Sequence, residues 1–470
     1  MAHSLRPANR EPVGSFDNLE GTKFTIYSNE NGTWQRMDAR EGTSEYRVSY
    51  VIGSGSHAMG YLIQLGDHLF QSPICYYTKR RAYGIAPGYE KIADPDFTRP
   101  ITDDCVLCHS GKPMHVSGTL NRYEVPAFAQ EGISCERCHG PSEQHLRRPV
   151  PGSIINPAKL KNAARDSVCE QCHLSGVVRI LNPGKKFEDF RPGQTLEEVF
   201  TVYRDAVPPG TPPEKFKVIS HPEQLAASAC ARKSLGKLWC GTCHDPHNKP
   251  LQTGQYYRDR CLSCHAGKLP ATHPTADNCV GCHMPKRSAF DGGHTVFTDH
   301  RIMRRPEEEL TSYPTGDELV AWREPDFAIA KRNLGLAYLD AGLKRNSPRL
   351  IVRGYRMLTE VQTVFPDDPA VFDGLGTALL LGGQAQEAKL AFDRLLQLDP
   401  SNPINEEKLG RAELSCGNVD AAISHLQKAL NLDLLQLSTV DLLEKIYRER
   451  GNTAAEVELA KRIRQAIDGH

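Results

Sequence analysis

Six short segments of the chain share one pattern: two cysteines separated by two residues, followed directly by a histidine. Two thiols in one turn can form thioethers with the two vinyl groups of a porphyrin, and the adjacent imidazole then lies beneath the iron. The pattern predicts six molecules of haem c (heme c), with twelve cysteines as attachment points and six histidines as iron ligands. These residues are Cys105, Cys108 and His109; Cys135, Cys138 and His139; Cys169, Cys172 and His173; Cys240, Cys243 and His244; Cys261, Cys264 and His265; and Cys279, Cys282 and His283.

Two other uses of the cysteines are weaker explanations. Pairs of Cys-x-x-Cys segments could form three structural zinc sites, but zinc gives no reason for a histidine after every pair. Twelve cysteines could also form disulfides, but a bridge between cysteines three residues apart is redox-labile rather than structural. Covalent haem accounts for all three residues of every copy.

Six low-spin haems would need six further axial ligands. Ten of the twelve histidines outside the motifs lie between the N-terminus and position 300, so we expect mostly bis-histidine iron, which has a low potential. His247 lies too close to its own motif to reach round that haem, so we expect it to serve a neighbouring one. The other assignments stay open. The expected distal ligands lie just after motifs, on a glycine-rich bend or in loops, and are His57, His145, His221, His247, His273 and His300.

The spacing of the motifs keeps the expected iron atoms close together. The first cysteines of the motifs are Cys105, Cys135, Cys169, Cys240, Cys261 and Cys279, so only the interval between the third and fourth is long. A chain spans at most about 3.5 Å per residue, and packing shortens that distance further. We therefore expect a continuous row of redox centres along which electrons can hop.

Three regions differ in composition. Residues 1–90 contain alternating apolar residues and the turn signal Asn31-Gly32, which predict a small antiparallel β meander. Residues 91–305 hold all six motifs and many prolines and glycines with little periodicity, as expected of a haem-packed cytochrome c domain. Residues 317–470 are rich in Ala, Leu and Glu and show helical periodicity.

A repeat is visible in the last region. Gly383-Gln384 recurs at equal steps as Gly417-Asn418 and Gly451-Asn452. The step matches the helix–turn–helix period of tetratricopeptide repeats, which is about 34 residues. An earlier unit ends at Gly342, further from Gly383 than one regular step, which implies a seven-residue insertion. A generic helical bundle is the alternative.

The expected fold combines these three regions. It is mainly α with much irregular structure: an N-terminal β meander, a haem-packed domain and a C-terminal α-solenoid of the tetratricopeptide-repeat (TPR) type. Three to four repeats are enough to stack into a stable solenoid.

Composition excludes some classes of function. The chain has 470 residues, with 57 Lys and Arg against 57 Asp and Glu, so it lacks the basic excess typical of nucleic-acid binding. No run of about 18 apolar residues occurs, so no transmembrane helix is expected. Apolar residues make up only 39% of the chain, which leaves room for cofactors in the interior.

The sequence resembles multihaem cytochromes c related to the tetrahaem cytochromes of nitrifying bacteria, in the variety fused to tetratricopeptide repeats. The resemblance covers nearly the whole chain. It is carried by Gly53-Ser-Gly-Ser-His57 with Tyr61-Leu-Ile-Gln64, Ala86-Pro-Gly-Tyr89, the motif at Cys105, Cys135-Glu-Arg-Cys-His-Gly-Pro141, Asn156-Pro-Ala-Lys-Leu160, Cys169-Glu-Gln-Cys-His173, Cys240-Gly-Thr-Cys-His-Asp-Pro-His247, Cys279-Val-Gly-Cys-His-Met-Pro285 and His294 to His300-Arg-Ile302.

The resemblance has two implications for the start of the chain. Similar proteins commonly carry a secretion signal and a further Cys-x-x-Cys-His before a stretch like Met1-Ala2-His3-Ser4, so the natural protein is expected to be longer, with one more haem. Haem attachment of this kind takes place outside the cytoplasmic membrane, which implies a periplasmic or extracellular location. A leaderless, haem-free cytosolic protein is the alternative.

Three functions compete. The first is electron transfer along mostly bis-histidine haems, with the repeats or exposed haem edges docking redox partner proteins. The second is reduction or oxidation of a small nitrogen or sulfur compound at one open haem, which leaves enzyme activity undecided. The third is a subunit of a conductive filament, for which the chain would form a homo-oligomer.

Overall fold

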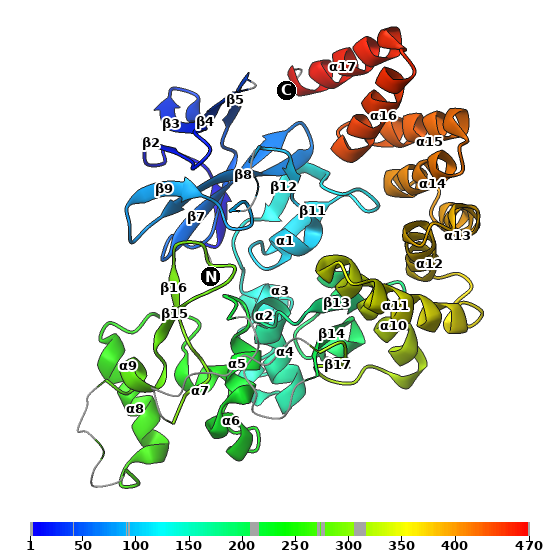
Figure 1. Ribbon diagram of the computed structural model, residues 1–470. Helices are drawn as coiled ribbons and strands as arrows, with labels where there is room; N and C mark the ends of the chain where they lie inside the picture. The colour runs from blue at the N-terminus through cyan, green and yellow to red at the C-terminus, as the bar shows by residue number, and fades with distance from the viewer. Residues whose placement is uncertain are drawn as a thin grey trace. The chain divides into compact units, whose positions relative to one another are not determined.

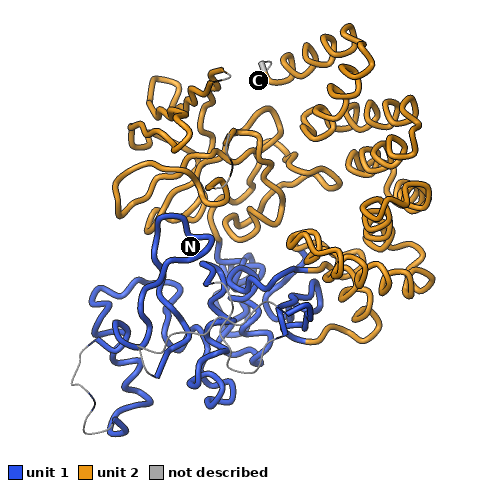
Figure 2. Tube along the Cα trace, viewed as in Figure 1, with its two compact units in different colours: residues 1, 134–179, 189–323 blue, residues 2–133, 180–188, 324–470 orange. Residues whose placement is uncertain are grey.

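The computed structural model describes residues 3–40, 42–90, 92, 95–206, 216–269, 273, 278–304 and 316–468. The fold is mixed rather than mainly α, with 42% of the described residues in helices and 20% in strands, because the N-terminal region forms two sheets. The chain divides into two compact units (Figure 2). Unit 1 contains residues 134–179 and 189–323, and unit 2 contains residues 2–133, 180–188 and 324–470. The predicted boundary at 305–317 falls largely outside the described residues.

The first sheet of unit 2 is a four-stranded antiparallel meander in the order β2-β3-β4-β5. The β3–β4 hairpin contains the expected turn signal, with Asn29 paired to Gly32 and Gly32 at φ +117°. A positive φ suits glycine, which has no Cβ to clash. The strands are β2 (Gly14–Asp17), β3 (Lys23–Asn29), β4 (Gly32–Ala39) and β5 (Gly42–Arg47).

The second sheet of unit 2 has the order β1-β6-β7-β8-β10, with β9 also paired to β8. Its central strand β7 is covered on both faces: Tyr61 and Ile63 belong to one hydrophobic cluster and Leu62 to another. Successive side chains of a strand point to opposite faces, so this sheet forms the core of the β-region. The strands are β1 (Leu5–Pro7), β6 (Tyr50–Ile52), β7 (Ala58–Leu65), β8 (His68–Tyr77), β9 (Ala82–Ile85) and β10 (Arg99–Pro100).

The second hydrophobic cluster also anchors helix α1 and the hairpin β11–β12. Val106 of α1, Tyr123 of β12 and Leu62 of β7 are all fully buried in it. The first Cys-x-x-Cys-His motif therefore packs against the sheet through Val106, which lies between its two cysteines. The elements are α1 (Asp103–Leu107), β11 (Lys112–His115) and β12 (Tyr123–Gln130).

Unit 1 holds the other five motifs on short helices connected by loops (Figure 1). Its pairings include β14 with β17 and β15 with β16, both antiparallel. The elements along this part of the chain are α2 (Glu136–His139), α3 (Glu143–Arg147), the 3₁₀ turn Pro157–Lys159, α4 (Asn162–His173), β13 (Val178–Leu181), the 3₁₀ turns Phe187–Asp189 and Leu196–Glu198, β14 (Phe200–Asp205), α5 (His221–Ala227), α6 (Ala229–Lys233), α7 (Cys240–Cys243), α8 (Thr253–His265), α9 (Cys279–His283), β15 (Lys286–Ser288), β16 (Val296–Thr298) and β17 (Leu319–Ala321).

The C-terminal part of unit 2 is a series of helical hairpins, coloured yellow to red in Figure 1. Gly383, Gly417 and Gly451 lie between the two helices of successive pairs, each with φ between +65° and +81°. The helices are α10 (Phe327–Arg345), α11 (Pro348–Val361), α12 (Pro369–Leu381), α13 (Ala385–Leu398), α14 (Pro403–Ser415), α15 (Val419–Leu432), α16 (Leu437–Glu449) and α17 (Thr453–Asp468).

The hydrophobic core repeats with the same period as the turn glycines. Leu375, Leu409 and Leu443 are buried at equivalent positions of α12, α14 and α16. Gly376 and Gly410 let paired helices approach closely, since a Cβ on Gly376 would lie 2.5 Å from the Phe392 ring. The sequence period therefore corresponds to one helical hairpin.

The first hairpin differs from the expected one. Gly342 lies inside α10, and the left-handed residue between α10 and α11 is Asn346, with φ +49°. Asparagine tolerates this conformation, so it replaces the glycine of later hairpins. Most of the expected seven-residue insertion lies in α10, which has 19 residues, whereas α12 has 13. In the described part of the chain, no helix combines the length and apolar character that crossing a bilayer requires.

Candidate haem-attachment sites

Motifs after the first form one turn of helix, and this explains their spacing. The His139 N–H donates to the Cys135 carbonyl at 2.9 Å, and the His244 N–H donates to the Cys240 carbonyl at the same distance. Positions i, i+3 and i+4 of a helix lie on one face, so both thiols and the imidazole share that face. The motifs lie on or against α1, α2, α4, α7, α8 and α9.

Several of these helices have no protein core of their own. Helix α8 has 13 residues and no buried residue, and the shorter helices α2, α7 and α9 also bury none. Isolated helices of this length are marginal in water, because packing of an apolar face normally stabilises them. The motif-bearing helices therefore fit a large apolar group held on the Cys–His face.

Hydrogen bonds select one tautomer of three motif histidines. Nδ1 of His139 donates to the Ile155 carbonyl at 2.7 Å, and Nδ1 of His283 donates to the Met303 carbonyl at 2.6 Å. His109 makes the same bond to the Ser4 carbonyl at 3.3 Å. A carbonyl can only accept, so Nδ1 carries the proton and Nε2 keeps its lone pair. Metal-binding histidines show this arrangement, in which the second nitrogen donates to an outer partner.

Two predicted distal histidines face motif histidines. The rings of His139 and His247 have centroids 5.7 Å apart and planes 20° from parallel. Those of His283 and His273 have centroids 6.0 Å apart and planes 17° from parallel. Two imidazoles on opposite sides of one metal, with metal–nitrogen bonds of about 2 Å, have centroids about 6 Å apart. Both pairs fit the two axial ligands of one iron.

Four further histidines form a cluster in unit 1. The centroid distances are 5.3 Å from His173 to His221, 4.5 Å from His221 to His300, and 6.0 Å from His300 to His244. Burial, with the nearby histidines, lowers the pKa of His221 to about 3, and burial lowers the pKa of His300 to about 4. His221 Nδ1 is buried with no hydrogen-bond partner among the described residues. Neutral, incompletely satisfied imidazoles of this kind fit iron ligands.

The last two predicted distal ligands, His57 and His145, lie outside the histidine pairs and the four-histidine cluster. His145 Nδ1 lies 2.8 Å from Ser153 Oγ, whose own hydrogen goes to the Val150 carbonyl, so His145 also keeps its Nε2 lone pair. His57 lies on the bend before β7, where its carbonyl accepts from the Thr78 N–H. Within the described residues, neither His145 nor the exposed His265 makes a ring contact with another histidine.

Thiols of successive motifs in unit 1 contribute to one another's pKa shifts. The neighbouring Cys240, burial and the nearby Cys138 raise the pKa of Cys169. Burial, with Cys279 nearby, raises the pKa of Cys261 to about 11. Burial also raises the pKa of Cys243, and the nearby Cys264 adds to that shift. These interactions connect the second to the sixth motif, including the third and fourth, which are the most widely spaced in the sequence.

In the described part of the chain, no three His, Cys, Asp or Glu side chains converge as ligands of a metal ion would. The structure contains no disulfide between any of the fifteen cysteines. Single histidines beside paired thiols are the arrangement that haem attachment needs.

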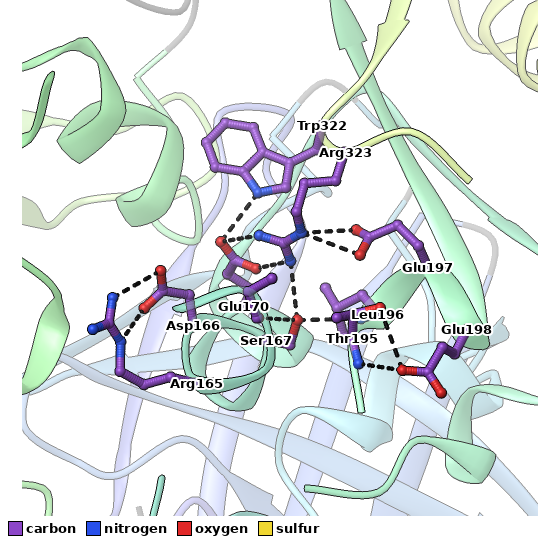
Figure 3. A network of polar contacts seen from close by, with 11 residues as sticks. Arg165, Asp166, Ser167, Glu170, Thr195, Leu196, Glu197, Glu198, Trp322 and Arg323 are labelled. Carbon is purple, nitrogen blue, oxygen red and sulfur yellow. Dashed lines mark hydrogen bonds and ion pairs between the residues drawn. The ribbon is translucent and has the colours of Figure 1, made fainter. Parts of the chain in front are cut away.

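Sequence reasoning missed a polar network around the third motif (Figure 3). Arg323 Nε donates to Glu197 at 3.1 Å, its Nη1 donates to Glu170 at 3.2 Å, and its Nη2 donates to Glu170 and Ser167. Trp322 Nε1 also donates to Glu170, at 3.0 Å. Burial raises the pKa of the Glu170 carboxyl, and the Arg323 guanidinium opposes that shift. No sequence signal connects residues so far apart.

Comparison with known proteins supports the class of site. No family model matches the chain. An alignment 199 residues long, which covers 38% of this chain, is 28% identical to the multihaem cytochrome MtrA of Shewanella baltica and covers 57% of that protein. A segment of 86 residues, 18% of the chain, is 31% identical to the C-type polyhaem cytochrome OmcC of Geobacter sulfurreducens and covers 11% of it. The chain is thus similar to multihaem cytochromes over part of its length, and spans less than two thirds of either relative.

Solved structures similar to the chain contain helical repeats. MamA matches with a TM-score of 0.26 and 19% identity, over 31% of this chain and 79% of that one. The first tetratricopeptide repeat domain of RPAP3, solved with an HSP90 peptide, matches with a TM-score of 0.23 and 15% identity, over 25% of this chain and 94% of that one. The assignment of helical repeats rests on the chain's own periodic core.

Proposed function

We propose that the chain is an electron-transfer protein that carries six c-type haems on its Cys-x-x-Cys-His motifs. Bound haem supplies an iron that cycles between ferrous and ferric states and so accepts one electron at a time. The observation that carries the proposal is the approach of the His139 and His247 rings, which brings a motif histidine and a predicted distal ligand to a centroid distance of 5.7 Å. The partial similarity to multihaem cytochromes supports it.

The ring contacts support an assignment of axial pairs. We assign His247 to the motif ending at His139 and His273 to the motif ending at His283. In the four-histidine cluster, His221 lies beside His173, and His300 lies near His244. His57 and His145 remain the proposed ligands for the other haems. With haem bound, such pairs would link histidines from different loops of unit 1.

The chain's own groups would orient the ligands. Carbonyl oxygens of Ile155, Met303 and Ser4 accept from Nδ1 of the motif histidines and direct Nε2 away from the backbone. Hydrogen bonds to the outer nitrogen also raise ligand basicity. The pKa shifts shared by thiols of successive motifs support a continuous row of sites from the second to the sixth motif.

The helical hairpins are proposed to dock a redox partner protein, because stacked helical repeats expose extended binding surfaces. We also propose that the chain is related to the tetrahaem cytochromes of nitrifying bacteria and that the protein is exported to the periplasm or the cell exterior. Spectroscopy tests the electron-transfer function. Low-spin bands that carbon monoxide leaves unchanged support it, whereas high-spin iron that binds nitrite or hydroxylamine favours the reductase or oxidase alternative.

A further inference from the structure

The motif histidine His244 has an outer partner of a different kind from those of three other motif histidines. Nδ1 of His139, His283 and His109 faces a backbone carbonyl. Nδ1 of His244 instead lies 3.3 Å from the hydroxyl of Tyr257, and the two rings have centroids 5.7 Å apart and planes 70° from parallel. A side-chain partner, unlike a carbonyl, can be removed by one substitution, so its effect on the histidine can be measured.

The tyrosine hydroxyl can either donate to Nδ1 or accept from it, so iron binding decides the direction of this hydrogen bond. An imidazole that binds iron through Nε2 carries its proton on Nδ1, and that N–H then donates to the Tyr257 oxygen. Burial, with Tyr256 and the Cys243 thiol nearby, raises the pKa of the Tyr257 hydroxyl. The acceptor is therefore a neutral phenol, close to the fourth attachment motif.

Tyr257 belongs to α8, the helix that carries the fifth motif. Positions i, i+4 and i+7 of a helix share a face, so Tyr257 lies on the same face of α8 as Cys261 and Cys264. Helices α7 and α8 contact each other, and His244 lies at the end of α7. The outer partner of the fourth motif's histidine is thus supplied by the helix of the fifth motif.

We propose that Tyr257 is a positioning residue for His244, whose Nδ1–H it accepts, and that this hydrogen bond lowers the redox potential of the haem on the fourth motif. The inference rests on the proposed function, because it requires haem on this motif. Donation from the outer nitrogen raises the basicity of a ligating histidine. A more basic ligand stabilises the ferric iron, which carries one more positive charge than the ferrous iron. Axial ligation and the hydrogen bonds around it are means by which a protein sets such potentials.

The test is a redox titration of the full chain, matured with haem, in wild-type form and as Tyr257→Phe. This substitution removes the hydroxyl and keeps the ring. The midpoint potential of one haem is expected to rise while the other five stay unchanged, and one low-spin signal of the ferric electron paramagnetic resonance spectrum is expected to move. A variant with Cys240 and Cys243 replaced by serine lacks the fourth haem and so identifies its signal.

The matched control is Tyr256→Phe, which removes the same hydroxyl from the preceding residue of α8. The Tyr256 hydroxyl accepts from Arg260 Nη2 at 3.3 Å, so its loss takes no hydrogen bond from a histidine. No haem potential is expected to shift in this variant.

Three results overturn the inference: six haems by mass with all midpoint potentials unchanged in Tyr257→Phe, equal shifts in Tyr257→Phe and Tyr256→Phe, or movement of a signal other than that of the fourth haem. If Tyr257→Phe does not mature, Tyr257→Gln and Tyr257→Met carry the test, because the two side chains are similar in size and only glutamine has an oxygen that can accept from Nδ1. A higher potential in Tyr257→Met than in Tyr257→Gln supports the inference, and equal potentials overturn it. Wild-type protein without covalent haem would instead refute the proposed function.

Discussion

His139 and His247 lie far apart in the sequence, yet their imidazole rings have centroids 5.7 Å apart and planes 20° from parallel. His139 follows its two cysteines on α2, and His247 follows the next-but-one motif, after α7. The Ile155 carbonyl holds the outer nitrogen of His139 and directs its Nε2 away from the backbone. In the proposed assignment, His247 serves the haem of the motif that ends at His139, and the consequences of this pairing can be measured.

Replacement of His247 by alanine should open one iron. Its haem would lose the distal ligand and become high-spin and able to bind carbon monoxide, while the haem count stays at six. The control is His425→Ala, because His425 contacts Glu406 at 2.6 Å in the repeat region and is not a proposed ligand. The measurement is the ferric electron paramagnetic resonance spectrum with carbon monoxide difference spectra. A fully low-spin spectrum in His247→Ala would refute this pairing.

The four-histidine cluster predicts additive loss of ligands. His221→Ala and His300→Ala should each convert one haem to high-spin iron, and the double variant should convert two, because each histidine is assigned to a different motif. Magnetic circular dichroism counts the high-spin haems in each variant. If the double variant shows no more high-spin iron than a single one, both histidines act on the same haem and the assignment is wrong.

Helix α8 should depend on its haem for stability. Replacing Cys261 and Cys264 with serine should remove one haem mass, and the amides of α8 should then exchange at least about tenfold faster, which corresponds to about 1.4 kcal/mol. The physical reason is that α8 buries no residue of its own. Hydrogen-exchange mass spectrometry measures the effect. Cys230→Ser, at a cysteine outside the motifs, should change neither haem mass nor exchange, and unchanged exchange in the double variant would contradict the prediction.

The close approach of paired helices in the repeat region predicts a large effect of one methyl group. Gly376→Ala should destabilise the α12–α13 hairpin by about 1–3 kcal/mol, because the new Cβ would overlap the buried Phe392 ring. This cost exceeds the roughly 1 kcal/mol that alanine gains over glycine within a helix. Faster amide exchange in α12 and α13 reports it.

The matched control for that variant is Gly383→Asn, in the turn of the same hairpin. Nothing lies within 4 Å of a Cβ there, and asparagine tolerates the φ of +75°. It should cost less than Gly376→Ala. The reverse order would show that the turn, rather than the helix contact, sets the stability of the hairpin.

Local patterns make part of this fold predictable. The regular step between turn glycines correctly predicts the length of one helical hairpin. Leu375, Leu409 and Leu443, which are separated by the same step, are buried at equivalent positions. The Asn31-Gly32 signal lies at the β3–β4 hairpin. The first repeat departs from the glycine pattern, because Gly342 lies inside α10 and Asn346 takes the left-handed position between α10 and α11.

Long-range relationships are not predictable in the same way. Glu170 and Arg323 are 153 residues apart, and no spacing rule connects an attachment motif to the residues after β17. The third and fourth motifs are the most separated in sequence, yet the thiols of Cys169 and Cys240 interact. The sequence predicts which histidines could act as ligands, but their pairing depends on how the loops of unit 1 fold back.

The central claim is that haem is covalently attached at all six motifs, and the intact mass of protein from a host that matures c-type cytochromes tests it most directly. The account predicts the 52.2 kDa polypeptide plus six haem masses, retained after extraction with acidified organic solvent. A colourless product, or pigment that the solvent removes to leave the bare polypeptide mass, would contradict it.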